Sequence, residues 1–405
     1  MSQATGKKGR EHLATLCVHE GGGTFQKRLA RSVSTPETFP VYAASVYAFD
    51  DIEALDAVYD RKAEGYIYSR MAAPNADAVS GILARADGGE AALVLPSGMA
   101  AITATILAST QAGEHIISSR TLYGGVHDFF ANELERRGVE VTFLDMTRDA
   151  VEAHIKKNTR LLYTEMISNP LMEVADVAAL SATARRRGLL LFVDNTFATP
   201  AVARPLDFGA DAVLYSATKY LGGHSDIVAG AVVANRAIIE RVKRLQTLYG
   251  FSAGAHDCWL LARSLRTLDL RMGKHSDNAL KVARFLQKQA VVDKVFYPGL
   301  PSSPSHGLAR RQFAPERFGG MLSADLKGGA KAVKTLLKNL RTIRLVPSLA
   351  GVATSISVPV KTSHRAYDRR ALKKMGIIPG QIRFSVGLEE AEDILAELEE
   401  AFSFL

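Results

Sequence analysis

Short apolar runs alternate with helical segments through the middle of the chain, and each run has the length of a buried strand. The runs lie at residues 91–95, 115–118, 139–144, 160–164, 189–193, 212–215 and 229–233. Strands that alternate with helices form a mostly parallel sheet covered on both faces. The pattern therefore predicts an α/β layered domain of about 200 residues.

Helical periodicity brackets this region. Residues 75–86 predict a helix that Gly88 and Gly89 stop, and a second helix is expected to begin at Ser97-Gly98 and run to about residue 110. From 257 to about 288, apolar residues recur at helical spacing, at Leu261, Leu265, Leu268 and Met272. This spacing predicts one long helix that joins two domains.

The rest of the chain mixes both patterns. Strands are expected at 321–326, 343–346, 355–360 and 382–386, with helices at 330–340 and 390–402. These elements predict a smaller α+β domain. We divide the chain into an N-terminal arm at 1–65, with weak periodicity and a glycine run at 21–23, an α/β domain at 66–265 and a C-terminal domain at 266–405. Arms of this kind often wrap a neighbouring subunit.

Length and composition narrow the class of protein. The chain has 405 residues, of which 47% are apolar and 23% charged, so a globular protein with two domains is expected. Its net charge of +8 comes from scattered basic residues interleaved with acidic ones, which argues against nucleic-acid binding. Two cysteines are too few for a disulfide framework or a metal cluster. Without a signal-like or membrane-spanning segment, a cytoplasmic protein is expected.

Two polar side chains follow apolar runs where parallel strands usually deliver catalytic groups. Lys219 follows one run, Asp194 follows another, and the hydroxyls of Ser216 and Thr218 flank the lysine. An amine can form a Schiff base, a carboxylate can hold a ring nitrogen protonated, and hydroxyls can hold a phosphate. Together these groups predict a pyridoxal phosphate site.

Further residues are compatible with such a site. Residues 97–101, Ser-Gly-Met-Ala-Ala, open a helix whose free N–H groups can cradle a phosphate. Tyr123 precedes Gly124 and Gly125, which leave its ring free to stack on a flat cofactor. Each feature also has an ordinary structural explanation, since a strand-end lysine is often a surface residue and Asp194 could cap a helix.

Two functions of other classes stay open at this point. A cofactor-free Schiff-base aldolase on a (β/α)₈ barrel would need the lysine but not Asp194 or the phosphate-holding groups. A non-catalytic binding or regulatory protein on the same fold is the second. Intact Lys219 and Asp194 argue against this second alternative.

Over nearly its whole length the chain resembles the pyridoxal phosphate-dependent Cys/Met metabolism enzymes. This trans-sulfuration family includes cystathionine γ-synthase, cystathionine γ-lyase, methionine γ-lyase and O-acetylhomoserine sulfhydrylase. The resemblance rests on residues 68–70, 97–101, 123–125, 169–170, 193–200, 216–226 and 383–387. It implies an aspartate aminotransferase-like fold of type I and an assembly that is a tetramer of two active dimers.

The same resemblance assigns roles to individual residues. It implies that Lys219 is the Schiff-base lysine, that Tyr123 stacks on the cofactor ring and that Asp194 holds the ring nitrogen. The phosphate would be held by Gly98, Met99, Ser216 and Thr218, and from the adjacent subunit by Tyr68 and Arg70. Asn169 would lie near the cofactor hydroxyl, while Arg383, helped by Ser348, would bind the substrate carboxylate. A guanidinium fork also suits a carboxylate geometrically. No metal site is expected.

The chain departs from the family pattern around the substrate. Residues 71–75 read Met-Ala-Ala-Pro-Asn where many relatives read Tyr-Gly-Asn-Pro-Thr. Gly125 stands where methionine γ-lyases commonly have a cysteine, and Pro347 where the cystathionine enzymes usually have a glutamate. Residues 350–359 lack two acidic residues and a histidine. Packing drift and a changed substrate both explain these differences.

The expected reaction follows from these assignments. We expect a γ-lyase that acts on an L-amino acid with a leaving group on Cγ and releases 2-oxobutanoate and ammonia. Lys219 would be the base and Tyr123 would protonate the leaving group. The alternatives are γ-replacement, as in O-acetylhomoserine sulfhydrylase or cystathionine γ-synthase, and an unusual substrate such as canavanine.

Overall fold

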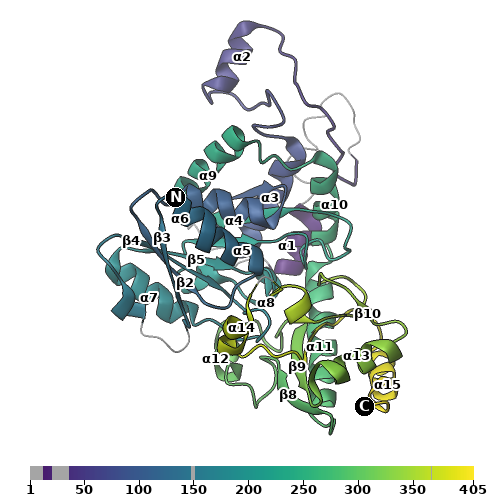
Figure 1. The fold of residues 1–405 in the computed structure, drawn as a ribbon. Coiled ribbons are helices and arrows are strands. Elements are labelled where there is room, and N and C mark those ends of the chain that lie inside the picture. The colour runs from purple at the N-terminus through teal and green to yellow at the C-terminus, as the bar shows by residue number, and fades with distance from the viewer. Residues whose placement is uncertain (1–11, 21–35, 147–150, 366) are drawn as a thin grey trace, which may run out of the picture.

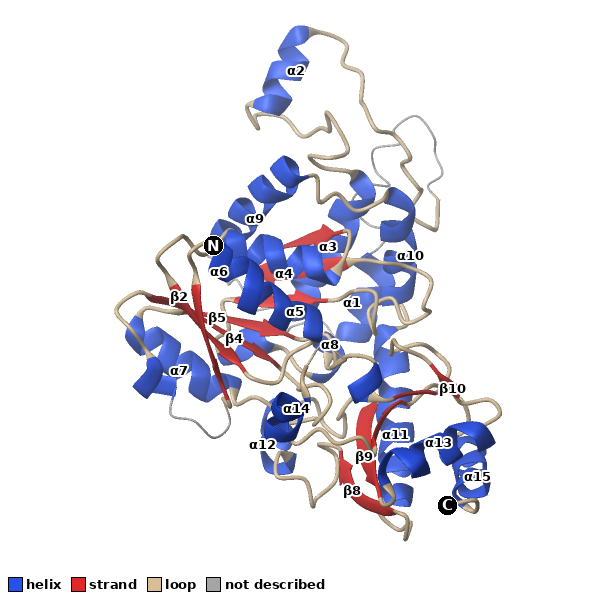
Figure 2. Ribbon diagram, in the orientation of Figure 1, coloured by secondary structure: helices blue, strands red, loops and turns tan. Residues whose placement is uncertain are grey.

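The structure is a computed structural model that describes residues 12–20, 36–146, 151–365 and 367–405. The glycine run at 21–23, which we assigned to the arm, lies outside the described residues. Figures 1 and 2 show two groups of strands, a larger one among helices in the first half of the chain and a smaller one near the C-terminus.

The larger sheet has seven strands in the order β1-β7-β6-β5-β4-β2-β3. Strand β7 runs antiparallel to both of its neighbours, whereas β3, β2, β4, β5 and β6 pair in parallel. The strands are β1 (Ala91–Leu95), β2 (His115–Ser119), β3 (Glu140–Leu144), β4 (Thr159–Glu165), β5 (Leu190–Asp194), β6 (Ala212–Tyr215) and β7 (Gly230–Ala234). The predicted mostly parallel sheet is confirmed. Because it is open, with β1 and β3 at its edges, a (β/α)₈ barrel is excluded.

Helices cover both faces of this sheet (Figure 1). They include α3 (Pro74–Asp87), α4 (Gly98–Leu107), α5 (Gly124–Asp128), α6 (Leu134–Arg136), α7 (Val177–Arg187), α8 (Thr199–Val202) and α9 (Arg236–Tyr249). The apolar residues form two buried clusters, since successive strand residues point to opposite faces. On β5, Leu191 and Val193 pack in the cluster that contains α3 and α7, while Phe192 packs with α4 and α9. By this alternation Asp194 faces the α4 side.

The prediction of one helix from 257 to about 288 is wrong. The structure has two helices, α10 (Ala255–Leu265) and α11 (Leu268–Leu286), separated by Arg266 and Thr267. The break is stabilised locally, because the Thr267 hydroxyl donates to the carbonyl of Ser264 at 3.2 Å and Arg271 donates to the same carbonyl at 2.9 Å. In the part of the chain that the structure describes, no helix is long and apolar enough to cross a membrane.

The smaller sheet has five strands in the order β10-β11-β12-β9-β8, and only β10 and β11 pair in parallel. They are β8 (Val292–Phe296), β9 (Met321–Leu326), β10 (Arg344–Leu345), β11 (Ser355–Ser357) and β12 (Gln381–Ser385). The sequence did not predict β8, an edge strand whose exposed Asp293 and Lys294 interrupt the apolar pattern. The remaining helices are α12 (His306–Gln312), α13 (Gly329–Asn339), α14 (Arg369–Met375) and α15 (Ala391–Phe402).

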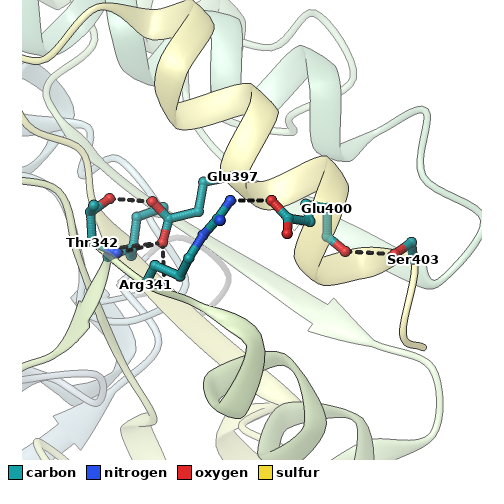
Figure 3. A network of polar contacts seen from close by, with 6 residues as sticks. Arg341, Thr342, Glu397, Glu400 and Ser403 are labelled. Atoms are coloured by element: carbon teal, nitrogen blue, oxygen red, sulfur yellow. Dashed lines mark hydrogen bonds and ion pairs between the residues drawn. The ribbon is translucent and has the colours of Figure 1, made fainter.

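The last helix is tied to the segment that leads into β10 (Figure 3). The Glu397 carboxylate accepts from the main-chain N–H groups of Arg341, Thr342 and Ile343 at 2.6, 2.8 and 3.1 Å, and Arg341 forms an ion pair with Glu400. These contacts fix the start of the strand that precedes Ser348. Helix α15 thus helps to position Ser348, which accepts a hydrogen bond from Lys219.

Two helices lie within the segment assigned to the N-terminal arm. Helix α1 (Leu13–Glu20) buries Leu16 and Cys17 in the main core and packs against α3 and α11. Helix α2 (Ile52–Tyr59) buries no residue and projects away from the body of the protein (Figure 1). The division into arm and domains remains a prediction. Helix α11 contacts α1 and α8, and it also contacts β8, β9 and α15. It therefore packs both against a helix beside the large sheet and against the small sheet.

Candidate active site

Lys219 lies in a tight turn after β6, at the carboxyl edge of the large sheet. The turn is closed by hydrogen bonds from the N–H of Lys219 to the carbonyl of Ser216 at 3.0 Å and from the N–H of Gly223 to the carbonyl of Lys219 at 2.7 Å. The half-buried Lys219 Nζ donates to Ser348 Oγ at 2.8 Å. Burial, and next the charge of Arg383, lower the pKa of Lys219. The amine therefore loses its proton more easily than an exposed lysine does.

A buried arginine anchors this turn from the start of α11. Arg271 is 5% exposed and donates to the carbonyls of Tyr220 at 2.7 Å and Leu221 at 3.3 Å. Gly223 has φ +73°, and a Cβ there would lie 2.1 Å from Arg271 Nη1, so both conformation and space require glycine. Helix α11, which follows the break after α10, thus holds the loop that carries Lys219.

Replacing Arg271 with leucine should destabilise the protein. The change leaves the carbonyls of Tyr220, Leu221 and Ser264 without their charged donor, so we expect the free energy of unfolding to fall by about 3 kcal/mol. Urea unfolding measures this loss. Arg263→Leu, an exposed position on α10, is the control and should change stability by less than about 0.5 kcal/mol. Equal stability of the two variants would show that Arg271 does not anchor the turn.

Asp194 ends β5 and is held by the residues that follow it. Its Oδ1 accepts from the N–H of Thr196 at 2.9 Å, and Thr196 Oγ1 in turn accepts from the N–H of Ser216 at 2.8 Å. Burial raises the pKa of Asp194, and the hydrogen bonds from Thr196 oppose this shift. The ends of β5 and β6 are therefore linked through one threonine.

The N-terminus of α4 lies against the Lys219 turn. The Ser97 hydroxyl caps the helix by accepting from the N–H of Ala100 at 3.0 Å. A Cβ at Gly98 would lie 2.7 Å from Ser216 Cβ, so only glycine allows this close approach. The helix start and Ser216 together form a site that suits an anion, because free N–H groups and the positive end of the helix dipole lie beside a hydroxyl.

Tyr123 precedes α5 and is half exposed, at 50%. Its ring and Met99 Sδ both lie close to Gly125, at 2.8 and 3.4 Å from the position of a Cβ there. The main-chain N–H of Tyr123 donates to Glu165 Oε1 at 2.7 Å. Glu165 was not among the residues predicted from the sequence, although its place at the end of a predicted strand, like that of Asp194, could have identified it.

A hydrogen bond joins Arg383, on β12 of the small sheet, to Asn169, which follows β4 of the large sheet. Arg383, 2% exposed on β12, donates from Nη1 to Asn169 Oδ1 at 2.8 Å, and its Nε has no hydrogen-bond partner among the described residues. Burial lowers the pKa of Arg383 to about 10, so the side chain stays positively charged near neutral pH. Ser348 accepts a hydrogen bond from Lys219, and its expected help to Arg383 stays a prediction.

Three residues that were expected at the phosphate, Thr218, Tyr68 and Arg70, have partners within this chain. The Thr218 hydroxyl donates to the carbonyl of Ala229 at 3.2 Å and accepts from its N–H at 3.0 Å, which closes the turn. Arg70 lies over the ring of Tyr68 and donates to the carbonyl of Thr247 at the end of α9. Both Tyr68 and Arg70 are exposed.

Comparison with known proteins identifies the family. The protein-family model for the Cys/Met metabolism PLP-dependent enzymes matches residues 14–403 of the chain. The chain belongs to this family. It is 39% identical over 392 residues to an L-methionine gamma-lyase of Fusobacterium nucleatum subsp. polymorphum, covering 96% of this chain and 97% of the relative.

Two solved structures of relatives share the whole fold. A cystathionine gamma-lyase of Lactobacillus plantarum complexed with L-serine is 36% identical, with a TM-score of 0.89 and coverage of 97% of this chain and 99% of that one. A putative O-acetylhomoserine (thiol)-lyase of Campylobacter jejuni, which carries a pyridoxyl-lysine phosphate, is 26% identical with the same TM-score, over 97% and 100% of the chains. The expected fold type I and the cofactor, pyridoxal phosphate, are confirmed.

The residues at the strand ends fit this cofactor chemically. A lysine with a lowered pKa, a buried carboxylate and a capped helix N-terminus lie at one edge of the sheet. They supply an imine-forming amine, a partner for a ring nitrogen and donors for a phosphate.

Proposed function

We propose that this family member is a pyridoxal phosphate-dependent γ-lyase for an L-amino acid with a leaving group on Cγ, which yields 2-oxobutanoate and ammonia. The observation that carries the proposal is the position of Lys219 Nζ, 2.8 Å from Ser348 Oγ and close enough to Arg383 for that charge to lower its pKa. A base and a carboxylate-binding group thus share one site. The relatives named γ-lyases support the reaction class.

We assign the roles as follows. Pyridoxal phosphate, when bound, supplies an aldehyde that combines with amines and a ring that accepts the electron pair left at Cα. Lys219 and the start of α4 would hold its aldehyde and phosphate ends, with Gly98, Met99, Ser216 and Thr218 at the phosphate. Asp194 would keep the ring nitrogen protonated.

The substrate is handled by a second group of side chains. Arg383 binds the α-carboxylate through its guanidinium, which Asn169 orients by accepting from Nη1 at 2.8 Å. Lys219 takes the Cα proton as a neutral amine, and its lowered pKa raises the neutral fraction near physiological pH. Tyr123, half exposed at the site, would stack on the cofactor ring and supply a proton to the leaving group.

We also propose that the site is completed by a second copy of the chain. Arg70 and Tyr68 are exposed, and their segment follows the projecting helix α2, so they can reach the phosphate of an adjacent subunit. Val46, which pairs with Tyr68, and Ile52 and Tyr59 on α2 are 65%, 71% and 57% exposed, which favours burial against a partner. The assembly would be a tetramer of two active dimers.

Cytoplasmic location also stays a prediction, in keeping with two free buried cysteines.

Elimination and γ-replacement share their early steps, so γ-replacement by a thiol is the second candidate. Pro347 and Ala353, which stand where relatives have other residues, are both exposed. Neither side chain fills the core, so packing does not dictate either residue. A changed leaving group, for which canavanine is one candidate, is a separate hypothesis that the substrate panel tests.

A substrate panel tests the proposed reaction. Purified enzyme is incubated with homocysteine, methionine, cystathionine, O-acetylhomoserine and canavanine, each with and without an added thiol, and the products are identified. We expect at least one substrate to yield 2-oxobutanoate and ammonia. A γ-replaced amino acid formed only with thiol would favour the second candidate. If no substrate gives a keto acid or a replaced product, the reaction class is wrong.

A further inference from the structure

Two carboxyl groups lie side by side at the ends of neighbouring strands. Glu165 is the last residue of β4 and Asp194 the last residue of β5, and the two are direct partners in the parallel pairing of these strands. Each residue is only 9% exposed. Because both side chains continue the same face of the sheet as Tyr163 and Phe192, the two carboxyl groups lie on the α4 side. Two buried carboxylates this close cannot both ionise cheaply.

Each carboxyl group of the pair accepts a hydrogen bond from a main-chain N–H group. Asp194 is stabilised as a carboxylate by Thr196, whose N–H donates to Oδ1 at 2.9 Å. Glu165 Oε1 accepts from the N–H of Tyr123 at 2.7 Å. Burial, and next the charge of Asp194, raise the pKa of Glu165 well above its usual range, against the opposing effect of the N–H groups of Tyr123 and Asn169.

Other charged and titratable groups surround Glu165. A pocket opens beside it and is also lined by Arg120, Asp145, Glu173 and Lys374, so both signs of charge face it from that side. Tyr163 lies two residues before it on β4, and Tyr367 approaches from the segment before α14. Asp194 is the carboxyl group directly paired with it in the sheet.

We propose that Glu165 is a positioning residue of the active site, which keeps one proton beside Asp194 and holds the main chain of Tyr123 in place. The protonated acid leaves Asp194 as the single negative charge available to a ring nitrogen. The same side chain fixes the loop that carries the Tyr123 ring. The inference rests on the proposed roles of Asp194 and Tyr123.

Stability against pH tests the proton independently of any reaction. If folded Glu165 keeps a proton that the unfolded chain loses, the wild type loses stability as pH rises above the ordinary glutamate pKa, and Glu165→Gln does not. The ratio of the unfolding constant of the wild type to that of Glu165→Gln should then rise about tenfold for each pH unit between about 5.5 and 7.5, a window that lies above the ordinary pKa of glutamate. Urea unfolding of the full-length chain measures it.

Glu140→Gln is the matched control. Glu140 is exposed on β3, and the hydrogen bond from Lys156 lowers its pKa, so it is ionised in both the folded and the unfolded chain over this window. Its ratio should not change with pH. A flat ratio for Glu165→Gln would overturn the proposal, whatever reaction the enzyme catalyses.

Cofactor affinity tests the positioning role. Glutamine keeps both the neutral charge and the oxygen that accepts from Tyr123, so the dissociation constant of pyridoxal phosphate should stay within about threefold of that of the wild type. Glu165→Ala loses this acceptor and should raise the constant by about tenfold or more. Equal losses in the two variants would show that an ionised Glu165 is needed, and no loss in either would show that it positions nothing.

Discussion

Replacing Lys219 with alanine is expected to abolish turnover. The change removes the group to which we assign the covalent link to the cofactor and the role of base for the Cα proton, so kcat should fall by at least about 10³-fold. The visible absorbance of the cofactor imine should disappear as well. Steady-state formation of keto acid and an absorbance spectrum of the purified variant measure both effects.

A distant lysine serves as the control for this variant. Lys334→Ala, at an exposed position on α13, should keep both the activity and the absorbance of the wild type. If Lys219→Ala retained activity within about tenfold of the wild type, general-base catalysis by this amine would be refuted.

Replacing Arg383 with alanine should have the second largest effect. The variant loses the buried guanidinium that we assign to the substrate carboxylate, and kcat/KM should fall by about 10³-fold, or about 4 kcal/mol. Most of the loss should be in KM, because the carboxylate is bound before and during the reaction. Initial rates over a range of substrate concentrations separate the two constants.

The Arg383 variant also has an electrostatic consequence at Lys219. The positive charge of Arg383 contributes to the lowered pKa of Lys219, so its removal should raise that pKa. The acidic limb of the pH–rate profile, which reports deprotonation of the base, should then move to higher pH. Arg383→Lys keeps the charge but not the planar fork, so it should restore the pH profile more fully than KM. A profile that does not move in Arg383→Ala would contradict the coupling between the two side chains.

The strand pattern was sufficient for the large sheet. Apolar runs at the predicted positions became β1 to β7, because a strand buried on both faces needs a continuous apolar sequence. The long helix failed for a local reason. Apolar spacing continues across Arg266 and Thr267, but the break is stabilised by hydrogen bonds that involve side chains of Thr267 and Arg271, which periodicity does not report.

The chemistry of single residues was also readable from the sequence. Lys219 and Asp194 follow apolar runs, and parallel strands bring their ends to one edge, so their proximity follows from the order of elements. Glu165 was not predicted from the sequence, because its proposed role depends on the residue beside it on the neighbouring strand. Only the register of β4 against β5 shows that its carboxyl group lies beside Asp194.

By itself, the sequence determined the family, the cofactor and the kind of sheet, because apolar periodicity and local motifs are properties of neighbouring residues. The tertiary structure decided which distant groups meet. Ser348 accepts from Lys219 across 129 positions, and Arg383 donates to Asn169 across 214. Such contacts set the charge and orientation of each side chain, since burial and partners, and not residue type alone, fix a pKa.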